Sequence, residues 1–265
     1  MSKRENSYSF PKISIVIPSL NKVKYIGETL ESITSQNYPN LEVIIQDGGS
    51  VDGTLEIIKK YSAKYPKIIK WESKKDKGQL SAITIGMKKA KGEILAYINA
   101  DDIYKNGTFM KVANQYLKER GCLWFAGYGD MIDSKGKKIA ILTAVYKRIL
   151  TIINYYPLLL LVNYIMQPSV FLTKRAYVRY GPFTGTGNFI LEYDMWLKLG
   201  REEMPNLVPF GLASFRMSEG NISSRQYSVV LEEDMEVVQK YTNNRLILVL
   251  HKLHNYLRTV LVKTL

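Results

Sequence analysis

The sequence predicts an α/β protein built on a mostly parallel, doubly wound sheet, with a helical extension at its C-terminus. Apolar runs typical of strands alternate with segments of helical periodicity up to about residue 120. The strand-like runs are almost continuously apolar, as expected for strands that helices cover on both faces. Strands joined by helices in this way run parallel, because only a long crossover connects parallel neighbours.

In the alternating half, each strand is bounded by a turn or breaker signal, such as Pro18 after the run ISIVIP or the glycines after LEVIIQD. Each intervening helix shows apolar residues at helical spacing. We expect strands at 13–18, 41–47, 68–71 and 93–99, and helices at 25–35, 55–65, 79–90 and 108–118.

After residue 120 the alternation ends. The pattern predicts strands at 123–132 and 137–142 around the turn SKGKK, a strand at 167–173, a helix at 192–199, an apolar run at 210–217, and mostly helix from 229 onward. We expect an N-terminal arm at 1–11, one domain at 12–225 and a tail at 226–265. No signal peptide is expected, because the N-terminus is polar.

The most apolar window, residues 149–166, contains Asn154, Pro157 and Asn163. Its length is marginal for a membrane span, and these polar and helix-breaking residues interrupt it. We interpret the window as a buried or interfacial segment.

The composition is that of a globular protein: 265 residues, 46% hydrophobic and 23% charged. A formal net charge of +13 suggests an anionic partner, which could be nucleic acid, an anionic membrane surface or a phosphorylated substrate. The single cysteine, Cys122, excludes a disulfide framework and a cysteine-rich zinc site. It lies in the apolar run CLWFAGY, so we expect a buried structural thiol.

Polar clusters follow the predicted strands at 19–21, 47–54, 76–79 and 99–102. The carboxyl ends of parallel strands meet at one edge of the sheet, where such folds bind ligands. We therefore expect these clusters to converge in space.

Each cluster allows a simple structural explanation as well as a chemical one. The turn after Asp47 is either a plain strand–turn–helix junction or a close approach to a ligand. Lys77 before a helix is either a solvated lysine or a phosphate ligand. Asp101 and Asp102 either cap the helix that starts near residue 106 or hold a divalent cation together with substrate phosphates.

In order, the segments PSLNKVKYI, DGGSVDGT, DKGQLSAITIGMKKAKGEILAYINADD, QPSVF and EYDMWLKLG resemble the family 2 glycosyltransferases. The resemblance covers roughly residues 12–220 and points to the branch common in bacterial O-antigen and capsule assembly. It implies a Rossmann-like GT-A fold and inverting transfer from a nucleotide-sugar donor to a hydroxyl of a glycan, or lipid-linked glycan, acceptor.

The resemblance also implies roles for matching positions. Asp194 is the expected general base, and Glu192 and Arg216 are expected to support the acceptor or a loop. Asp101 and Asp102 are the expected ligands of Mg²⁺ or Mn²⁺. The expected donor-binding residues are Pro18, Ser19, Asn21, Asp47, Lys77, Gln79, Asn99 and Ala100.

Two positions depart from the family pattern. Asn99 replaces the first acidic residue of the metal motif, which removes a charge from the donor site. Met217 and Ser218 stand where many relatives carry a metal-binding histidine. We therefore expect a metal held weakly, mostly by Asp101 and donor phosphates.

The tail is basic and amphipathic. Lys240, Arg245, Lys252, Arg258 and Lys263 occur in residues 240–265 without any acidic residue. One helical face carries Leu246, Val249, Leu250, Leu253, Leu257, Val260 and Leu261. Such a helix either lies on an anionic membrane surface or packs its apolar face on the core. The resemblance favours a cytoplasmic protein, peripheral at the inner face of the membrane.

Two alternative functions share this sequence pattern. A nucleotidyltransferase-like enzyme would use the same sheet, phosphates and metal, but PSLNKVKYIGE is not the glycine-rich basic loop that it needs after its first strand. A non-catalytic basic module on the same fold would bind membrane or nucleic acid instead. We expect no nucleic-acid partner. His251 and His254 have a metal-like spacing but lack a third ligand.

Overall fold

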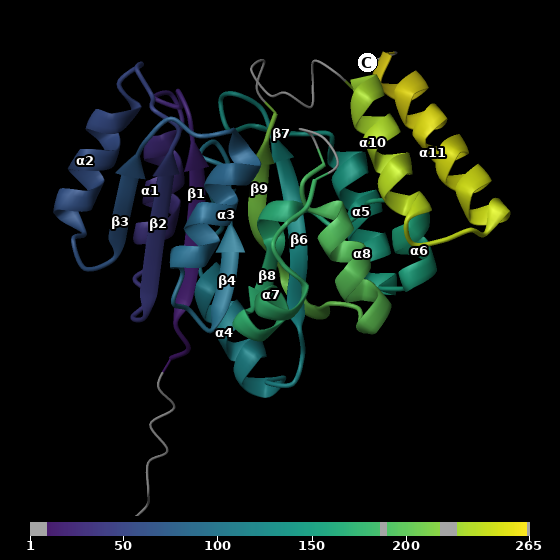
Figure 1. Ribbon diagram of the computed structural model, residues 1–265, viewed down its shortest axis with the longest axis horizontal. Coiled ribbons are helices and arrows are strands. Elements are labelled where there is room, and N and C mark those ends of the chain that lie inside the picture. Colours follow the sequence, from purple (N-terminus) through teal and green to yellow (C-terminus); the bar gives the residue numbers. More distant parts are fainter. Residues whose placement is uncertain (1–9, 186–189, 218–226, 264–265) are drawn as a thin grey trace, which may run out of the picture.

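The computed structural model describes residues 10–185, 190–217 and 227–263, with side chains described as far as Arg258 except at 227 and 228. The N-terminal arm, except its last two residues, and the expected boundary at 225 lie outside these ranges. The elements, in chain order, are β1 (Ile13–Ser19), α1 (Ile26–Thr34), β2 (Leu41–Asp47), α2 (Thr54–Lys64), β3 (Ile69–Ser73), α3 (Gln79–Lys89), β4 (Ile94–Tyr97), β5 (Ile103–Tyr104), α4 (Thr108–Lys118), β6 (Trp124–Ile132), β7 (Lys138–Ile139), α5 (Ile141–Ile153), α6 (Tyr156–Leu161), the 3₁₀ turn η1 (Gln167–Ser169), β8 (Val170–Thr173), α7 (Lys174–Tyr180), α8 (Tyr193–Glu202), β9 (Asn206–Arg216), α10 (Tyr227–Gln239) and α11 (Arg245–Lys263) (Figure 1).

The first half of the sheet is the predicted parallel, doubly wound unit. Strand β1 pairs in parallel with β2 and β4, and β2 pairs in parallel with β3. Every residue of β1 and β2 is buried, as the continuous apolar runs predicted. Ser19 lies opposite Asp47 in the register, so β1 and β2 end together.

The second half adds strands of both directions. The order across the sheet is β3-β2-β1-β4-β8-β6-β9-β5, with β7 attached to β6. Because β8 is antiparallel to both β4 and β6, strand β6 points the same way as β4, and β9 is parallel to β6. The carboxyl ends of β1, β2, β4, β6 and β9 therefore share one edge.

One predicted strand is shorter than expected and is followed at once by a helix. The expected strand at 137–142 is reduced to β7, and α5 begins at Ile141. Ala140 has a φ of 47°, which ends the hairpin and redirects the chain into the helix. The apolar residues after Ala140 recur at helical rather than alternating spacing, so the helix is the local preference.

Two apolar clusters cover the two faces of the sheet. Ile15 and Ile17 face the cluster that includes Leu30 of α1 and Phe109 of α4. Val16, between them, faces the opposite cluster, which contains α3 and α8. This alternation within a wholly buried strand is the physical signature of a three-layer arrangement.

The C-terminal helices share this core. Val237 and Val238 of α10 are fully buried in the same cluster as Trp196 of α8. Figure 1 places α10 and α11 at the end of the molecule far from α2, beside α5, α6 and α8. The expected tail is thus packed on the domain through α6 and α8.

Cys122 is partly buried, and burial, followed by the nearby carboxylates of Glu203 and Glu119, raises the pKa of its thiol to about 12. This protonated, unreactive thiol agrees with the structural role predicted for it.

None of the helices within the described ranges combines the length and hydropathy needed to cross a bilayer.

Helix α3 packs on β1 through Gly86, and this contact yields a stability prediction. A Cβ at position 86 would lie 2.4 Å from Cγ1 of the buried Val16. We expect Gly86→Ala to lower the free energy of unfolding by about 1–3 kcal/mol through overpacking, measured by urea denaturation. Gly121→Ala is the matched control, because a Cβ there meets nothing within 4 Å. Equal stability of the two variants would contradict the close packing of α3 on β1.

Candidate active site

The predicted donor-site residues converge at the edge where β1, β2 and β4 end. Lys22, in the loop after β1, places its Nζ 2.6 Å from Oδ2 of Asp101 after β4. Gln79, at the start of α3, donates from Nε2 to Oδ1 of Asn99 at 2.6 Å. Side chains spread over some eighty residues of sequence therefore form one connected polar group, as the topology predicted.

Asp47 shapes the loop that follows β2. Its Oδ2 accepts hydrogen bonds from the backbone N–H groups of Gly49 and Ser50 and from the Ser73 hydroxyl, while its Oδ1 accepts from the Ser50 hydroxyl. Burial alone would raise the pKa of Asp47, but these bonds outweigh burial and hold its pKa below the usual value. Asp47 is therefore an ionised carboxylate that is bound within its own turn.

The loop after β1 is fastened to this turn. The backbone N–H of Asn21 donates to the Ser50 hydroxyl at 2.8 Å, and the Asn21 amide oxygen accepts from Val51 N–H at 3.0 Å. Asn21 has a φ of 51°, a left-handed conformation that asparagine tolerates better than most residues. Pro18 and Ser19 end β1, and Leu20 separates them from Asn21.

Ser19 carries a buried hydroxyl without a hydrogen-bond partner among the described residues. A buried polar atom left alone in this way is costly unless something else binds it. It lies at the end of β1, beside Asp47 in the register, where the family resemblance placed donor contacts.

Asp101 and Asp102 have different environments. Both are buried, but Asp102 accepts from the backbone N–H of Arg216 at 2.7 Å and from the Asn99 amide at 3.2 Å. Burial and then the neighbouring Asp101 raise the pKa of Asp102 well above its usual range. Helix α4 begins after Gly107, so Asp102 does not cap it. Asp102 faces β9, and Asp101 faces Lys22.

Arg216 is a fully buried structural residue. Its Nε donates to the Asp101 carbonyl at 2.8 Å, one terminal nitrogen donates to the Asp133 carbonyl at 3.2 Å, and the other pairs with Glu28. The guanidinium also lies 4.7 Å from the centre of the Tyr25 ring. All three guanidinium nitrogens of Arg216 are thus engaged inside the protein. The loop-support role expected for it agrees with this geometry.

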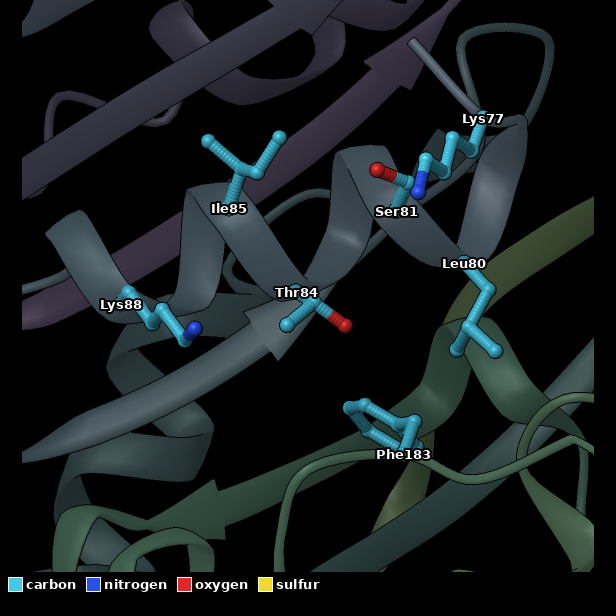
Figure 2. A pocket seen from close by; sticks show the side chains of 7 residues that line it. All are labelled: Lys77, Leu80, Ser81, Thr84, Ile85, Lys88 and Phe183. Carbon is cyan, nitrogen blue, oxygen red and sulfur yellow. The ribbon is translucent and has the colours of Figure 1, made fainter.

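Lys77 and Gly78 precede α3, as predicted. Lys77 is exposed and lines a shallow hollow along α3 (Figure 2). In that view Leu80 of α3 extends toward Phe183, and Ser81 lies beside Lys77. Phe183 is itself buried and packs edge-on against Tyr97 of β4, with ring centres 5.2 Å apart. The hollow therefore begins near the edge of the sheet where β1, β2 and β4 end. The segment that leads to α8 borders it.

Glu192 and Asp194, at the start of α8, also have different environments. Asp194 accepts from Thr184 at 2.6 Å and Lys198 at 2.6 Å on Oδ2, and from Tyr241 at 2.7 Å on Oδ1. Burial raises its pKa, but the three partners lower it more, so the net pKa lies below the usual value. Both oxygens of Asp194 are thus occupied by the protein.

Glu192 has fewer partners. It is partly buried, and the Tyr97 hydroxyl donates to its Oε2 at 3.4 Å. Burial raises the pKa of Glu192 to about 7, against the lowering effect of hydrogen bonds and of Lys147. A carboxylate with a pKa near neutrality exchanges protons readily at physiological pH.

A divalent cation fits this site only through Asp101. Asp102 is committed to Asn99 and Arg216, and no cluster of three or more histidine, cysteine or acidic residues forms within the described part of the chain. Both histidines lie in α11, and Ser218, beside the expected histidine position, is outside the described residues. One carboxylate with substrate phosphates is within the range that Mg²⁺ accepts. Lys22 occupies the Asp101 oxygen that such a cation would use.

Several contact residues were not anticipated from sequence. Lys22, Tyr97, Thr184 and Tyr241 each bind a predicted site residue. A further contact residue, Lys198, could have been predicted from the sequence, because it follows Asp194 by four residues on a helix.

Solved structures identify the fold. The chain superposes on S. aureus TarS 1–349 in complex with UDP-GlcNAc with a TM-score of 0.62 at 18% identity, covering 86% of this chain and 65% of that one. It superposes on the mannosyltransferase PcManGT from Pyrobaculum calidifontis, in complex with GDP-Man and Mn²⁺, with a TM-score of 0.67 at 14% identity, covering 94% and 70%. The architecture is the GT-A fold, as predicted.

Sequence comparison gives the family. The family model described as "Glycosyl transferase family 2" matches residues 14–181, and the chain belongs to this family. An uncharacterised glycosyltransferase of Rickettsia typhi is 28% identical over 202 residues, which is 75% of this chain and 61% of that protein. TuaG of Bacillus subtilis, named for teichuronic acid biosynthesis, is 31% identical over 122 residues, 46% of this chain and 48% of TuaG. The chain thus spans less than two thirds of the length of these relatives.

The buried position of Arg216 leads to a second stability prediction. Lysine keeps the charge but cannot bridge Asp101, Asp133 and Glu28 together. We expect Arg216→Lys to lower the free energy of unfolding by about 2–4 kcal/mol, measured by urea denaturation. The control is Arg201→Lys on the exposed side of α8, for which we expect a change within about 0.5 kcal/mol. An unchanged midpoint in both variants would contradict the structural role of Arg216.

Proposed function

We propose that this protein transfers a sugar from a nucleotide-sugar donor to a hydroxyl of a glycan acceptor, with inversion, in the synthesis of a cell-surface polysaccharide. The observation that carries the proposal is the polar arrangement at the sheet edge. Lys22 pairs with Asp101, Gln79 bonds Asn99, and the buried Ser19 hydroxyl at the end of β1 has no partner among the described residues. Family membership and the nucleotide sugars bound in the two solved structures support the same substrate class.

In this proposal the donor nucleotide lies against the ends of β1 and β2, where Ser19 offers its free hydroxyl. Pro18, Asn21 and Asp47 shape that pocket, and Gln79, Asn99 and Ala100 form its far wall. The diphosphate lies near Lys22, Lys77 and Asp101, where the two lysines can donate charge-assisted hydrogen bonds to phosphate oxygens. Mg²⁺ or Mn²⁺ on Asp101, when bound, supplies positive charge that stabilises the leaving diphosphate.

We propose Glu192 as the general base and Asp194 as the residue that positions it. This reverses the roles expected from the family resemblance. Asp194 has both oxygens occupied and a lowered pKa, so it is a poor proton acceptor. Glu192 has one long hydrogen bond and a pKa raised to about 7, which suits proton transfer from a sugar hydroxyl.

We further propose a lipid-linked glycan as the acceptor and a cytoplasmic protein, peripheral at the inner face of the membrane. The net charge of +13 and the basic amphipathic α11 support this location.

The first experiment is a donor screen. Purified protein is incubated with UDP-, GDP- and dTDP-sugars in Mn²⁺, Mg²⁺ or EDTA, with membrane lipid extract as acceptor source, and released nucleotide is measured. We expect turnover of one donor and at least about a tenfold loss in Asp101→Asn, because the cation at the leaving group is then lost. Glu119→Gln, an exposed residue at the opposite end of α4, is the control. Failure to turn over any donor would overturn the proposal.

The pH profile separates the two carboxylates. If Glu192 is the base, the transfer rate rises with pH through about 7, because its ionised form accepts the proton. Glu192→Gln is then expected to lose about 10²–10⁴-fold in rate while donor binding persists. Asp194→Asn is expected to retain the pH dependence with a smaller loss. A flat profile above pH 5 with an inactive Asp194→Asn would instead make Asp194 the base.

A further inference from the structure

Helix α5 exposes an unusual amount of apolar surface. Thr151 is its only buried residue, and Leu142 is 85% exposed. Its exposed apolar side chains, together with Tyr155 just after it, are Ile141, Leu142, Val145, Tyr146, Ile149, Ile152 and Ile153. Monomeric soluble proteins rarely leave a contiguous aliphatic helix face in water, so we expect a partner to cover this face.

Helix α11 buries polar side chains and exposes many of its apolar ones, which is the reverse of an ordinary surface helix. It buries His251 and Asn255, which hydrogen-bond each other at 3.0 Å, and His251 also bonds the Leu160 carbonyl at 2.9 Å. Ile247 and Leu248 pack against the core, but most leucines of the described part of α11 are exposed, and Leu246 is 66% exposed. The exposed apolar side chains of α11 are Leu246, Val249, Leu250, Leu253, Tyr256 and Leu257. Its apolar face is therefore not packed on the core, which was one of the two interpretations of the sequence.

The two helices meet through one aromatic contact. The Tyr146 ring of α5 stacks on the His254 ring of α11 with centres 6.1 Å apart, and the Tyr146 hydroxyl lies 3.3 Å from Nε2 of His254. Figure 1 shows both helices at the same end of the molecule. Together the exposed apolar side chains form one surface, here called the α5–α11 surface.

The charged residues within α5 and α11 themselves have one sign, while the neighbouring α10 carries the exposed Glu232 and Glu236. Neither α5 nor α11 contains an aspartate or glutamate, while Arg245 and Lys252 are exposed on α11. Aliphatic residues flanked by cations and by Tyr146, Tyr155 and Tyr256 match the interface of an anionic bilayer, where tyrosines favour the headgroup level. A protein partner would more often meet an aromatic-rich patch with charges of both signs at its rim.

We propose that the α5–α11 surface docks this protein in the plane of an anionic lipid bilayer, with α5 as well as α11 inserted at the headgroup boundary. Helix α5 begins just beyond β6, whose carboxyl end shares the candidate donor edge. Docking through α5 therefore brings that edge close to the lipid surface. For the part concerning the acceptor, this inference rests on the proposed function: a lipid-linked acceptor would reach the site without leaving the bilayer.

Vesicle co-sedimentation tests the docking directly. The protein is mixed with vesicles of phosphatidylcholine alone, or with 30% phosphatidylglycerol, at low and high salt. We expect sedimentation with the anionic vesicles and at least about a tenfold weaker partition for Leu142→Gln/Ile149→Gln on α5, because two inserted aliphatic side chains are lost. We expect the same for Leu246→Gln/Leu253→Gln on α11. These side chains are exposed, so thermal melts should match the parent protein.

Val178→Gln is the matched control, because Val178 is a 72% exposed apolar residue on α7, outside the α5–α11 surface. Absence of binding to anionic vesicles at low salt would overturn the proposal. Parent-like binding by the α5 variant would overturn the role of α5. Dimers that dissociate in the same variants, without vesicle binding, would show instead that the surface joins two copies of this chain. Lipid binding needs no sugar donor, so failure here is distinct from failure of the transferase proposal.

Discussion

Two neighbouring carboxylates at the end of a buried strand must be compensated, and the candidate active site depends on how this is done. Asp101 and Asp102 would repel each other and resist burial without partners. Lys22 compensates Asp101, while Asn99 and the backbone of Arg216 bind Asp102. The compensation thereby holds the loops after β1 and β4 against the end of β9.

Arg216 extends the same constraint across the sheet. Its side chain binds the Asp101 carbonyl, the loop after β6 and a glutamate of α1. The buried Arg216 side chain therefore holds together segments that are far apart in the sequence. A donor site placed on such a fixed frame keeps its geometry before the substrate arrives, which is the arrangement that electrostatic catalysis requires.

The parallel half of the fold was predictable because its signals are local. Apolar runs, helical spacing and turn residues each act within a few positions, and the right-handed crossover rule then assembles them. The second half was less predictable because the direction of β8 depends on which strands become neighbours. The short hairpin strand also runs directly into the helical spacing that begins after Ala140. The exposure of α5 was equally hidden, since an apolar helix has the same sequence whether it faces a core or a surface.

The contacts of the candidate site were also only partly predictable from the sequence. Topology predicted which edge the polar clusters share, but not which atoms meet. The pair Lys22–Asp101 joins positions 79 apart, and the bond from Arg216 to Asp101 joins positions 115 apart. Nothing in the local pattern distinguishes the occupied Asp194 from the less restrained Glu192, because the difference comes from Thr184, Lys198 and Tyr241 in space.

Tyr241 links the C-terminal helices to the candidate site. It stands between α10 and α11, and its hydroxyl binds Asp194 at the start of α8. The C-terminal helices are thus part of the folded domain rather than a separable segment. Their removal would expose Asp194 to water, so the C-terminal helices and the start of α8 form one mechanical unit.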